Sequence, residues 1–217
     1  GQLGADLVAY FGNDARALGH SDIDLTNPDQ LRRVLEAVQP RRIINCAAYN
    51  FVDRAEDEPE KAFAVNAFGV RQLAKWCRDH ETPLMHISSD YVFGLDAASR
   101  TPFSETAPTG PVSVYGASKL AGEQFVRALC PQHWIVRACG LYGNNAAHGK
   151  GNFVKTILRL AKERPELRIV HDQRCTPTST ADLAGLLAAL VRTEDFGVYH
   201  ATNSGDCTWF EFAQEIV

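Results

Sequence analysis

Three side chains with complementary proton chemistry occur in two short segments of the chain. Ser89 lies in the segment SSDYVF, residues 88–93, and Tyr115 and Lys119 lie in YGASK, residues 115–119. A hydroxyl, a phenol and an amine can together protonate a carbonyl oxygen while a hydride reaches the carbonyl carbon. The set therefore indicates reduction of a ketone with a nicotinamide cofactor.

The spacing of Tyr115 and Lys119 suits this chemistry if residues 113–129 form a helix. Residues four apart lie one turn above each other on the same face, so the amine would stand beside the phenol. We expect the Lys119 ammonium to lower the pKa of Tyr115 from its ordinary value of about 10. Ser89 follows a predicted strand over 84–88 and would bind the same carbonyl oxygen.

Composition limits the classes of protein to consider. The chain has 217 residues, 45% of them hydrophobic and 22% charged, which is typical of a globular protein with a sizeable core. A net charge of −4 argues against nucleic acid or an anionic membrane as partner. We find no signal peptide and no apolar stretch of the roughly 18 residues that a spanning helix needs, so we expect a cytoplasmic protein.

The cysteines and histidines give no metal or disulfide signature. The 6 cysteines contain no C-x-x-C pair, and the 7 histidines contain no H-x-x-x-H pair. Free thiols in a reducing compartment explain this pattern better than a disulfide framework or a zinc site. We therefore predict no metal site.

Strand and helix patterns alternate along the chain. Helices are expected over 28–39, 59–78, 113–129, 152–163, 180–192 and 208–217, and strands over 14–18, 42–47, 84–88, 134–138, 167–171 and 198–200. Alternation with continuous apolar strands predicts an α/β fold, a Rossmann-type doubly wound parallel sheet. Sites in such sheets form at the carboxyl ends of strands, where residues 47–49 and 88–89 fall.

The chain opens on Gly1-Gln2-Leu3-Gly4, which leads directly into a predicted helix. Glycines at this spacing are typical of a dinucleotide-binding turn, where the backbone approaches a pyrophosphate at a helix N-terminus. We therefore expect the chain to begin inside a G-x-x-G-x-x-G loop, with the first strand lying before Gly1.

Several segments in order match one family. The chain resembles the dTDP-4-dehydrorhamnose reductases, within the extended short-chain dehydrogenase/reductases. The matching segments span almost the whole chain: GQLG at 1–4, DLT at 24–26, NCAAY at 45–49, VDRAE at 52–56, VN at 65–66, SSDYVF at 88–93, YGASK at 115–119, NFV at 152–154, and DQ at 172–173 leading to PT at 177–178.

The resemblance implies roles for individual residues. Tyr115 would be the proton donor, Lys119 would tune it and bind the nicotinamide ribose, and Ser89 would hold the carbonyl oxygen. The other residues expected to bind the cofactor are Gly1, Gln2, Leu3, Asp24, Leu25, Ala47, Ala48 and Tyr49. Those expected to contact a nucleotide-sugar substrate are Tyr91, Asn152, Phe153, Lys155 and Arg174.

The sequence departs from the family pattern at three places. Gly140 stands where the family commonly has a tryptophan that stacks on the sugar, and Cys175 replaces a glycine. The family's last segment is absent, so we expect an incomplete substrate-binding lobe over 140–175 and 201–217. The Rossmann domain would take 1–139 and 176–200. The departures leave the identity of the nucleotide sugar open.

The turn after the predicted strand over 14–18 bears on the cofactor. An acidic residue usually binds the ribose 2′-hydroxyl of NAD, but here Gly19-His20-Ser21 follows and the first acid is Asp22. An uncharged or basic turn tolerates a 2′-phosphate. NADP(H) is therefore favoured, with NAD(H) as the alternative.

The leading hypothesis is NADPH-dependent reduction of a 4-keto nucleotide sugar, dTDP-4-dehydrorhamnose to dTDP-rhamnose. One alternative is a nucleotide-sugar epimerase or dehydratase, although dehydration usually needs Asp followed by Glu and here Tyr91 follows Asp90. Another is a non-catalytic regulatory subunit similar to the methionine adenosyltransferase β subunit, which also carries a Leu-Tyr-Gly as at 141–143. A reductase of a different carbonyl and a homodimeric state are also left open.

Overall fold

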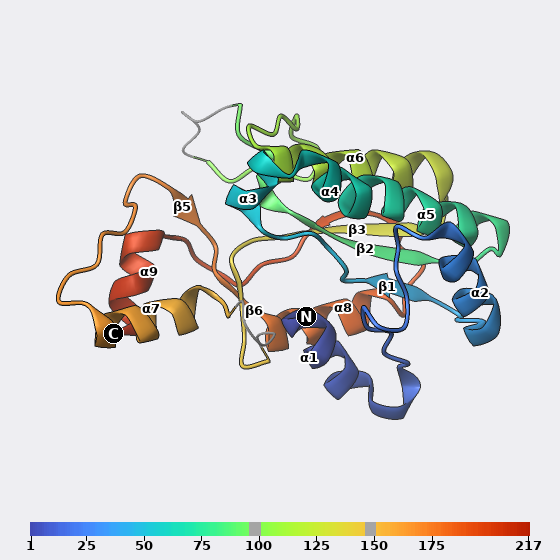
Figure 1. The fold of residues 1–217 in the computed structure, drawn as a ribbon, viewed down its shortest axis with the longest axis horizontal. Helices are drawn as coiled ribbons and strands as arrows, with labels where there is room; N and C mark the ends of the chain where they lie inside the picture. The colour runs from blue at the N-terminus through green and yellow to red at the C-terminus, as the bar shows by residue number, and fades with distance from the viewer. Residues whose placement is uncertain (96–100, 146–150) are drawn as a thin grey trace. The chain divides into compact units, whose positions relative to one another are not determined.

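A computed structural model of the chain describes residues 1–95, 101–145 and 151–217. Helices, strands and turns alternate along the chain (Figure 1). Their bounds are α1 Gln2–Phe11, η1 Gly12–Asp14, α2 Pro28–Val38, β1 Ile43–Asn45, α3 Val52–Asp57, α4 Pro59–Phe63, η2 Ala64–Gly69, α5 Val70–Asp79, β2 Leu84–Ser89, η3 Asp90–Val92, α6 Val114–Leu129, β3 His133–Ala138, β4 Leu141–Tyr142, α7 Phe153–Glu163, β5 Arg174–Cys175, β6 Thr178–Ser179, α8 Thr180–Leu190, β7 Gly197–His200, β8 Cys207–Thr208 and α9 Trp209–Ile216.

The chain divides into two compact units. The sheet unit comprises Ala17–Arg137 and Val191–His200, and the terminal unit comprises Gly1–Arg16, Ala138–Leu190 and Ala201–Val217. The domain boundaries expected from the resemblance concern which residues serve cofactor and substrate, and they stay a prediction.

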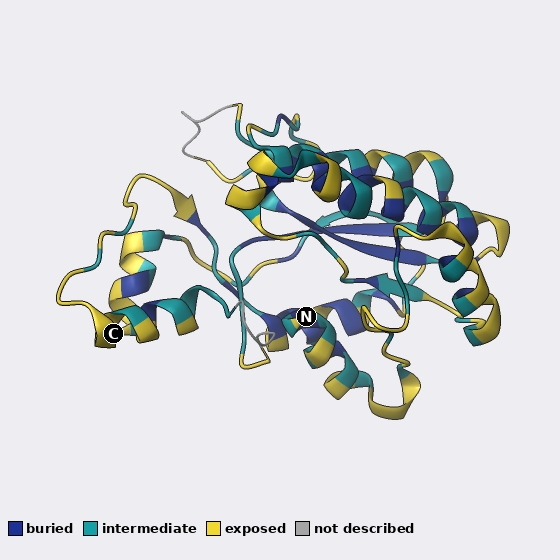
Figure 2. Cartoon of the chain, viewed as in Figure 1, coloured by how far each residue is buried: buried dark blue, intermediate teal, exposed yellow. Residues whose placement is uncertain are grey.

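The sheet unit is built on a sheet of order β1-β2-β3-β7. β1 pairs with β2 and β3 pairs with β7, both in parallel, as the alternating pattern predicts. All six residues of β2 are buried, as the dark strands in Figure 2 show. α5 and α6 cover the sheet with a core of aliphatic side chains that includes Leu73, Leu84, Val126 and Ile135. The predicted Rossmann-type α/β class is confirmed.

Helix ends follow the signals in the sequence. Asn27 caps α2 by accepting a hydrogen bond from the Gln30 N–H at 3.0 Å, and Pro28 occupies the first turn. Ser113 caps α6 in the same way, accepting from the Gly116 N–H at 3.1 Å. α9 opens with a capping box between Thr208 and Glu211. These interactions confirm the predicted helix starts at 28, 113 and 208 to within one residue.

Two predicted strands are wrong. Residues 14–18 form no strand: Asp14 ends η1, and residues 15–18 have no partner in a described ladder although the Ala15 backbone is extended. Residues 167–171 also form no strand. The strand in this part of the chain is β5, Arg174–Cys175, which pairs with β8 in an antiparallel ladder.

The predicted helix over 59–78 is interrupted by the π-helical segment η2 between α4 and α5. α6 crosses this segment closely at Gly122. A Cβ added to Gly122 would lie 2.2 Å from the carbonyl oxygen of Asn66, a distance that real Cβ contacts do not reach. Glycine at 122 therefore allows α6 to approach the backbone of η2.

The terminal unit contains short ladders and packed helices. α1 packs against α8, β4 pairs in parallel with β6, and β5 pairs antiparallel with β8. α7 packs against α9 through an aromatic cluster in which the Phe153 ring lies 4.7 Å from the Trp209 ring and 5.5 Å from the Phe212 ring. These aromatic side chains thus hold together α7 and α9, which are distant in sequence.

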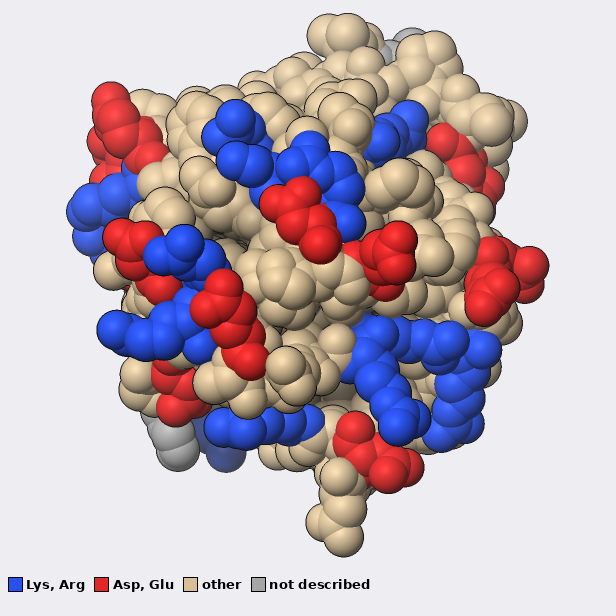
Figure 3. All heavy atoms as spheres, turned by 90° about the vertical axis from the view of Figure 1, so that its right-hand side faces the viewer, with Lys and Arg blue, Asp and Glu red and all other residues tan. Residues whose placement is uncertain are grey.

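Charged side chains of both signs are interspersed over the face in Figure 3. No helix among the described residues is long and apolar enough to cross a membrane.

We predict that Gly122→Ala destabilises the chain by about 1–3 kcal/mol, because the new methyl group meets a backbone carbonyl that cannot move aside. Urea unfolding measures the change. Gly185→Ala is the matched control, since a Cβ at this other helical glycine would lie 3.7 Å from the nearest atom, a ring carbon of Tyr10. The control should be neutral or stabilising. Equal stability of Gly122→Ala and wild type would contradict the close approach.

Candidate active site

A row of buried polar side chains runs along the face of α6 that covers β2. Tyr115, Lys119 and Glu123 lie four residues apart, and they are 9%, 2% and 0% exposed. Each meets a different part of β2 or β3. The helix that the sequence predicts thus carries Tyr115 and Lys119 on one face, next to the strand that ends in Ser89.

Lys119 spans from α6 to the backbone of β2. Its Nζ donates a hydrogen bond to the carbonyl oxygen of Ile87 at 2.7 Å. Burial lowers the pKa of Lys119 to about 8, while the charge of Glu123 acts in the opposite direction. The ammonium is therefore held in place by a strand carbonyl and is easier to deprotonate than an exposed lysine.

Tyr115 and Ser89 share a hydrogen bond through their side chains. The Ser89 hydroxyl also donates to Asp90 Oδ1 at 2.9 Å and accepts from the Tyr91 N–H at 3.2 Å. The Tyr91 ring meets the Tyr115 ring edge-on at 5.4 Å. Ser89, Tyr91 and Tyr115 therefore form one cluster at the carboxyl end of β2.

The expectation that Lys119 lowers the pKa of Tyr115 is not met in this structure. Burial raises the pKa of Tyr115 to about 12, and only the hydrogen bond with Ser89 opposes the rise. Lys119 has its Nζ on Ile87 instead. A phenol with a raised pKa is fully protonated near neutral pH, which is the state that a proton donor needs.

Glu123 anchors the far end of the row in an ion pair that the sequence analysis missed. Arg137 on β3 donates to both Glu123 oxygens, from Nε at 2.9 Å and from Nη2 at 2.7 Å. Ser88 Oγ donates to Glu123 Oε1 at 2.6 Å. The signal in the sequence was Glu123 four residues beyond Lys119, continuing the same helix face.

Two buried asparagines, also missed as organisers, hold the loop after β1. Asn66 on η2 accepts from the Tyr49 N–H at 2.8 Å and donates to the Tyr49 carbonyl at 2.9 Å, and it also donates to Ser118 Oγ. Asn45 accepts from the Ala47 N–H at 3.1 Å. The backbone of Ala47, Ala48 and Tyr49 is thus fixed while Ala47 stays exposed.

Asp24 and Leu25 lie in a turn before α2. Asp24 accepts hydrogen bonds from the Thr26 N–H at 2.8 Å and from the Thr26 hydroxyl at 2.7 Å, and these lower its pKa. The Leu25 side chain is buried in the core of the sheet unit, so only its backbone is available to a ligand.

Gly1, Gln2, Leu3 and Asn152 belong to the terminal unit. Leu3 is buried, Gly1 is exposed, and no acidic residue occurs in the first turn of α1. Asn152 donates to Gln2 Oε1 at 3.1 Å and to the Gly143 carbonyl at 2.8 Å, and it caps α7 by accepting from the Lys155 N–H. The structure brings Gln2 and Asn152 together, although Asn152 already uses its side chain locally.

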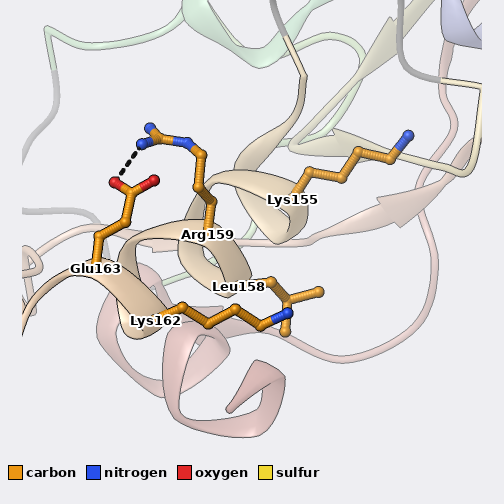
Figure 4. A pocket seen from close by; sticks show the side chains of 5 residues that line it. All are labelled: Lys155, Leu158, Arg159, Lys162 and Glu163. Atoms are coloured by element: carbon orange, nitrogen blue, oxygen red, sulfur yellow. Dashed lines mark hydrogen bonds and ion pairs between the residues drawn. The ribbon is translucent and has the colours of Figure 1, made fainter.

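The remaining predicted substrate residues are spread over the terminal unit. Phe153 lies in the aromatic cluster of α7 and α9. Lys155 donates to the Asn144 carbonyl at 2.7 Å and lies at one end of a hollow on α7 lined also by Leu158, Arg159, Lys162 and Glu163 (Figure 4). Arg174 pairs with Asp206 across the β5–β8 ladder.

The backbone at Gly140, where the family commonly has a tryptophan, has a conformation and surroundings that favour glycine. Its φ is +55°, a conformation that favours glycine, and a Cβ there would lie 3.2 Å from the Pro177 Cα. The Trp209 ring from α9 comes within 3.5 Å of the same point. The backbone at 140 is therefore shaped for glycine in this chain.

Comparison with known proteins places this arrangement in context. The family model described as the RmlD substrate binding domain matches residues 1–217. The chain is 41% identical over 218 residues to a dTDP-4-keto-6-deoxy-D-glucose reductase of Streptomyces niveus, covering 99% of this chain and 74% of the relative. It is 40% identical over 225 residues to the dTDP-4-dehydrorhamnose reductase of Escherichia coli strain K12, covering 98% and 73%.

A solved structure is also similar over the whole chain. The dTDP-4-dehydrorhamnose reductase of Bacillus anthracis, crystallised in complex with NADP, superimposes with a TM-score of 0.91 at 41% identity. The match covers 100% of this chain and 76% of that one.

The buried Lys119 predicts a pH dependence of stability. The folded chain binds this proton more weakly than the unfolded chain, since the pKa falls from 10.5 to about 8. Between these values the unfolded chain carries more protons, so raising the pH favours the folded chain. Lys119→Met removes the effect.

We expect the unfolding free energy of wild type, relative to Lys119→Met, to rise by roughly 2 kcal/mol between about pH 8 and pH 10. Denaturant unfolding at several pH values gives the difference. A difference that does not change with pH would show that Lys119 titrates like an exposed lysine.

Proposed function

Because the chain belongs to the family of the RmlD substrate binding domain, we propose that it reduces the 4-keto group of a dTDP-linked sugar with NADPH. The substrate we propose is dTDP-4-dehydrorhamnose, which would become dTDP-rhamnose. The observation that carries the proposal is that β2 and α6 bring Ser89, Tyr115 and Lys119 to one buried face, in a chain about 40% identical to such reductases over its full length.

Each unit, taken by itself, has features that suit a dinucleotide. Ala47 and Ala48 offer small side chains beside a backbone that Asn45 and Asn66 hold rigid. The first turn of α1 has no acidic side chain to repel a pyrophosphate. Asp22 uses its carboxylate to accept from the Gly19 N–H at 2.7 Å, so the turn over 19–22 folds back on itself. When bound, NADPH would supply the hydride.

Ser89, Tyr115 and Lys119 would each have a separate role in the reaction. Tyr115 would give its phenolic proton to the carbonyl oxygen, and Ser89, already hydrogen-bonded to that phenol, would hold the same oxygen. Lys119 would bind the ribose. Asn152, Phe153, Lys155, Arg174 and Tyr91 remain the proposed contacts of the nucleotide sugar. Cytoplasmic location and homodimer formation stay predictions.

The buried side chains of Tyr115 and Lys119 also bear on the alternative functions, a regulatory subunit and a dehydratase. A protein that uses a dinucleotide only for binding has no need of a buried phenol and lysine, yet both are placed and hydrogen-bonded here. The residue after Asp90 is Tyr91, whose ring packs on Tyr115, so the acid pair of a dehydratase is not formed.

Tyr115→Phe should lower turnover of dTDP-4-dehydrorhamnose by at least about 100-fold, because the proton donor is lost. NADPH affinity should stay within a few-fold, as the ring is retained. Steady-state kinetics and fluorescence titration measure the two quantities. Tyr199→Phe, on β7 with its hydroxyl on the Asp195 carbonyl, is the matched control and should keep turnover. Wild-type turnover by Tyr115→Phe would reject the assignment.

We also expect NADPH to give a higher kcat/KM than NADH, since the turn has no acid before Asp22, and Asp22 already accepts the Gly19 N–H. Initial rates with each cofactor at saturating nucleotide sugar test this. A preference for NADH would mean that another residue binds the ribose.

A further inference from the structure

Two cysteines face each other across the β5–β8 ladder of the terminal unit. The antiparallel register pairs Arg174 with Thr208 and Cys175 directly with Cys207. Opposite residues in such ladders have Cα atoms about 4.5–5.5 Å apart. A disulfide needs roughly 4.4–6.8 Å, so the backbone already provides the required spacing.

The two thiols are also in contact. Directly opposed residues of an antiparallel ladder have their side chains on the same face, and the Cys175 thiol lies close enough to raise the pKa of Cys207. Cys175 is 8% exposed and Cys207 is half-buried. Cys77 and Cys130, which also neighbour each other, are 0% and 1% exposed and lie in the core of the sheet unit. Reagents therefore reach the pair at 175 and 207 first through Cys207.

We propose that Cys175 and Cys207 form a reversible dithiol–disulfide site, which low-molecular-weight disulfides such as oxidised glutathione convert to an internal disulfide. Neither residue takes part in the proposed reduction. The site goes beyond that reaction and does not depend on it.

The exchange balances in two steps. The Cys207 thiolate attacks one sulfur of oxidised glutathione, the glutathione S–S bond breaks, and one glutathione thiolate leaves and is protonated. The Cys175 thiolate then attacks Cys207 Sγ, forming the internal bond and releasing the second glutathione. Two cysteine thiols are oxidised and one glutathione disulfide is reduced to two thiols.

The surroundings of the two thiols determine how fast the disulfide forms and which segments it links. Burial and the neighbouring thiol raise the pKa of Cys207, and the Arg174 guanidinium opposes this, so little thiolate forms at neutral pH and the exchange is slow. β8 leads directly into the capping box of α9. An internal bond would therefore tie the start of α9 covalently to the segment around Cys175.

The test is incubation of the reduced full chain with oxidised glutathione, followed by intact-mass measurement and peptide mapping without reductant. We expect most chains to lose the mass of two hydrogens, with the peptide containing Cys175 linked to that containing Cys207. Dithiothreitol should restore the original mass. Cys175→Ser should stop at a glutathione adduct on Cys207. The matched control is Cys46→Ser, at the half-buried free thiol that follows β1, and it should form the same internal bond as wild type.

Other outcomes would overturn the proposal. One is a stable glutathione adduct on wild-type Cys207, and another is a disulfide that joins either residue to a different cysteine. A third is no change in mass with oxidised glutathione although a thiol-specific alkylating reagent labels Cys207. Because the readout is covalent, it is independent of whether the chain reduces any sugar.

Discussion

The structure of the sheet unit depends on buried polar side chains through which α6 packs on β2, beside the aliphatic core to which Val126 and Leu84 belong. Lys119 is 2% exposed and reaches the Ile87 carbonyl, and Glu123 is fully buried and receives Ser88 and Arg137. Leaving any of these groups without its partner inside the protein would cost several kcal/mol. The helix is therefore held in one rotation and one register, and Tyr115 is placed beside Ser89 as a result.

This packing needs a close approach, and glycine provides it. A Cβ at Gly116 would lie 2.2 Å from the Tyr91 carbonyl oxygen, as one at Gly122 would from that of Asn66. The two glycines flank Lys119 along the helix. The same approach brings Ser118 to Asn66, which holds the Tyr49 backbone. The proposed cofactor loop and Tyr115, the proposed proton donor, are thus tied to one helix.

Much of this arrangement follows from the sequence. Caps at Asn27, Ser113 and Thr208 fix helix starts because they depend on local hydrogen bonds. The predictions of strands over 14–18 and 167–171 were wrong because strand pairing depends on a partner strand, which a local sequence pattern does not reveal. The pKa of Tyr115 was misjudged for a related reason: sequence spacing indicates which charge is near, but burial, which dominates here, is a property of the whole fold. Asn152 illustrates the same limit, since its side chain serves Gln2, Gly143 and a helix cap.

The central claim is that this chain moves a hydride to C4 of a nucleotide sugar beside the Tyr115 cluster. The most direct measurement uses NADPH deuterated at the transferred position of the nicotinamide, with dTDP-4-dehydrorhamnose as substrate and mass spectrometry and NMR of the product. The account predicts one deuterium at C4 of dTDP-rhamnose, in proportion to the NADPH consumed. A product without deuterium, or consumption of NADPH with no change in the sugar, would contradict it.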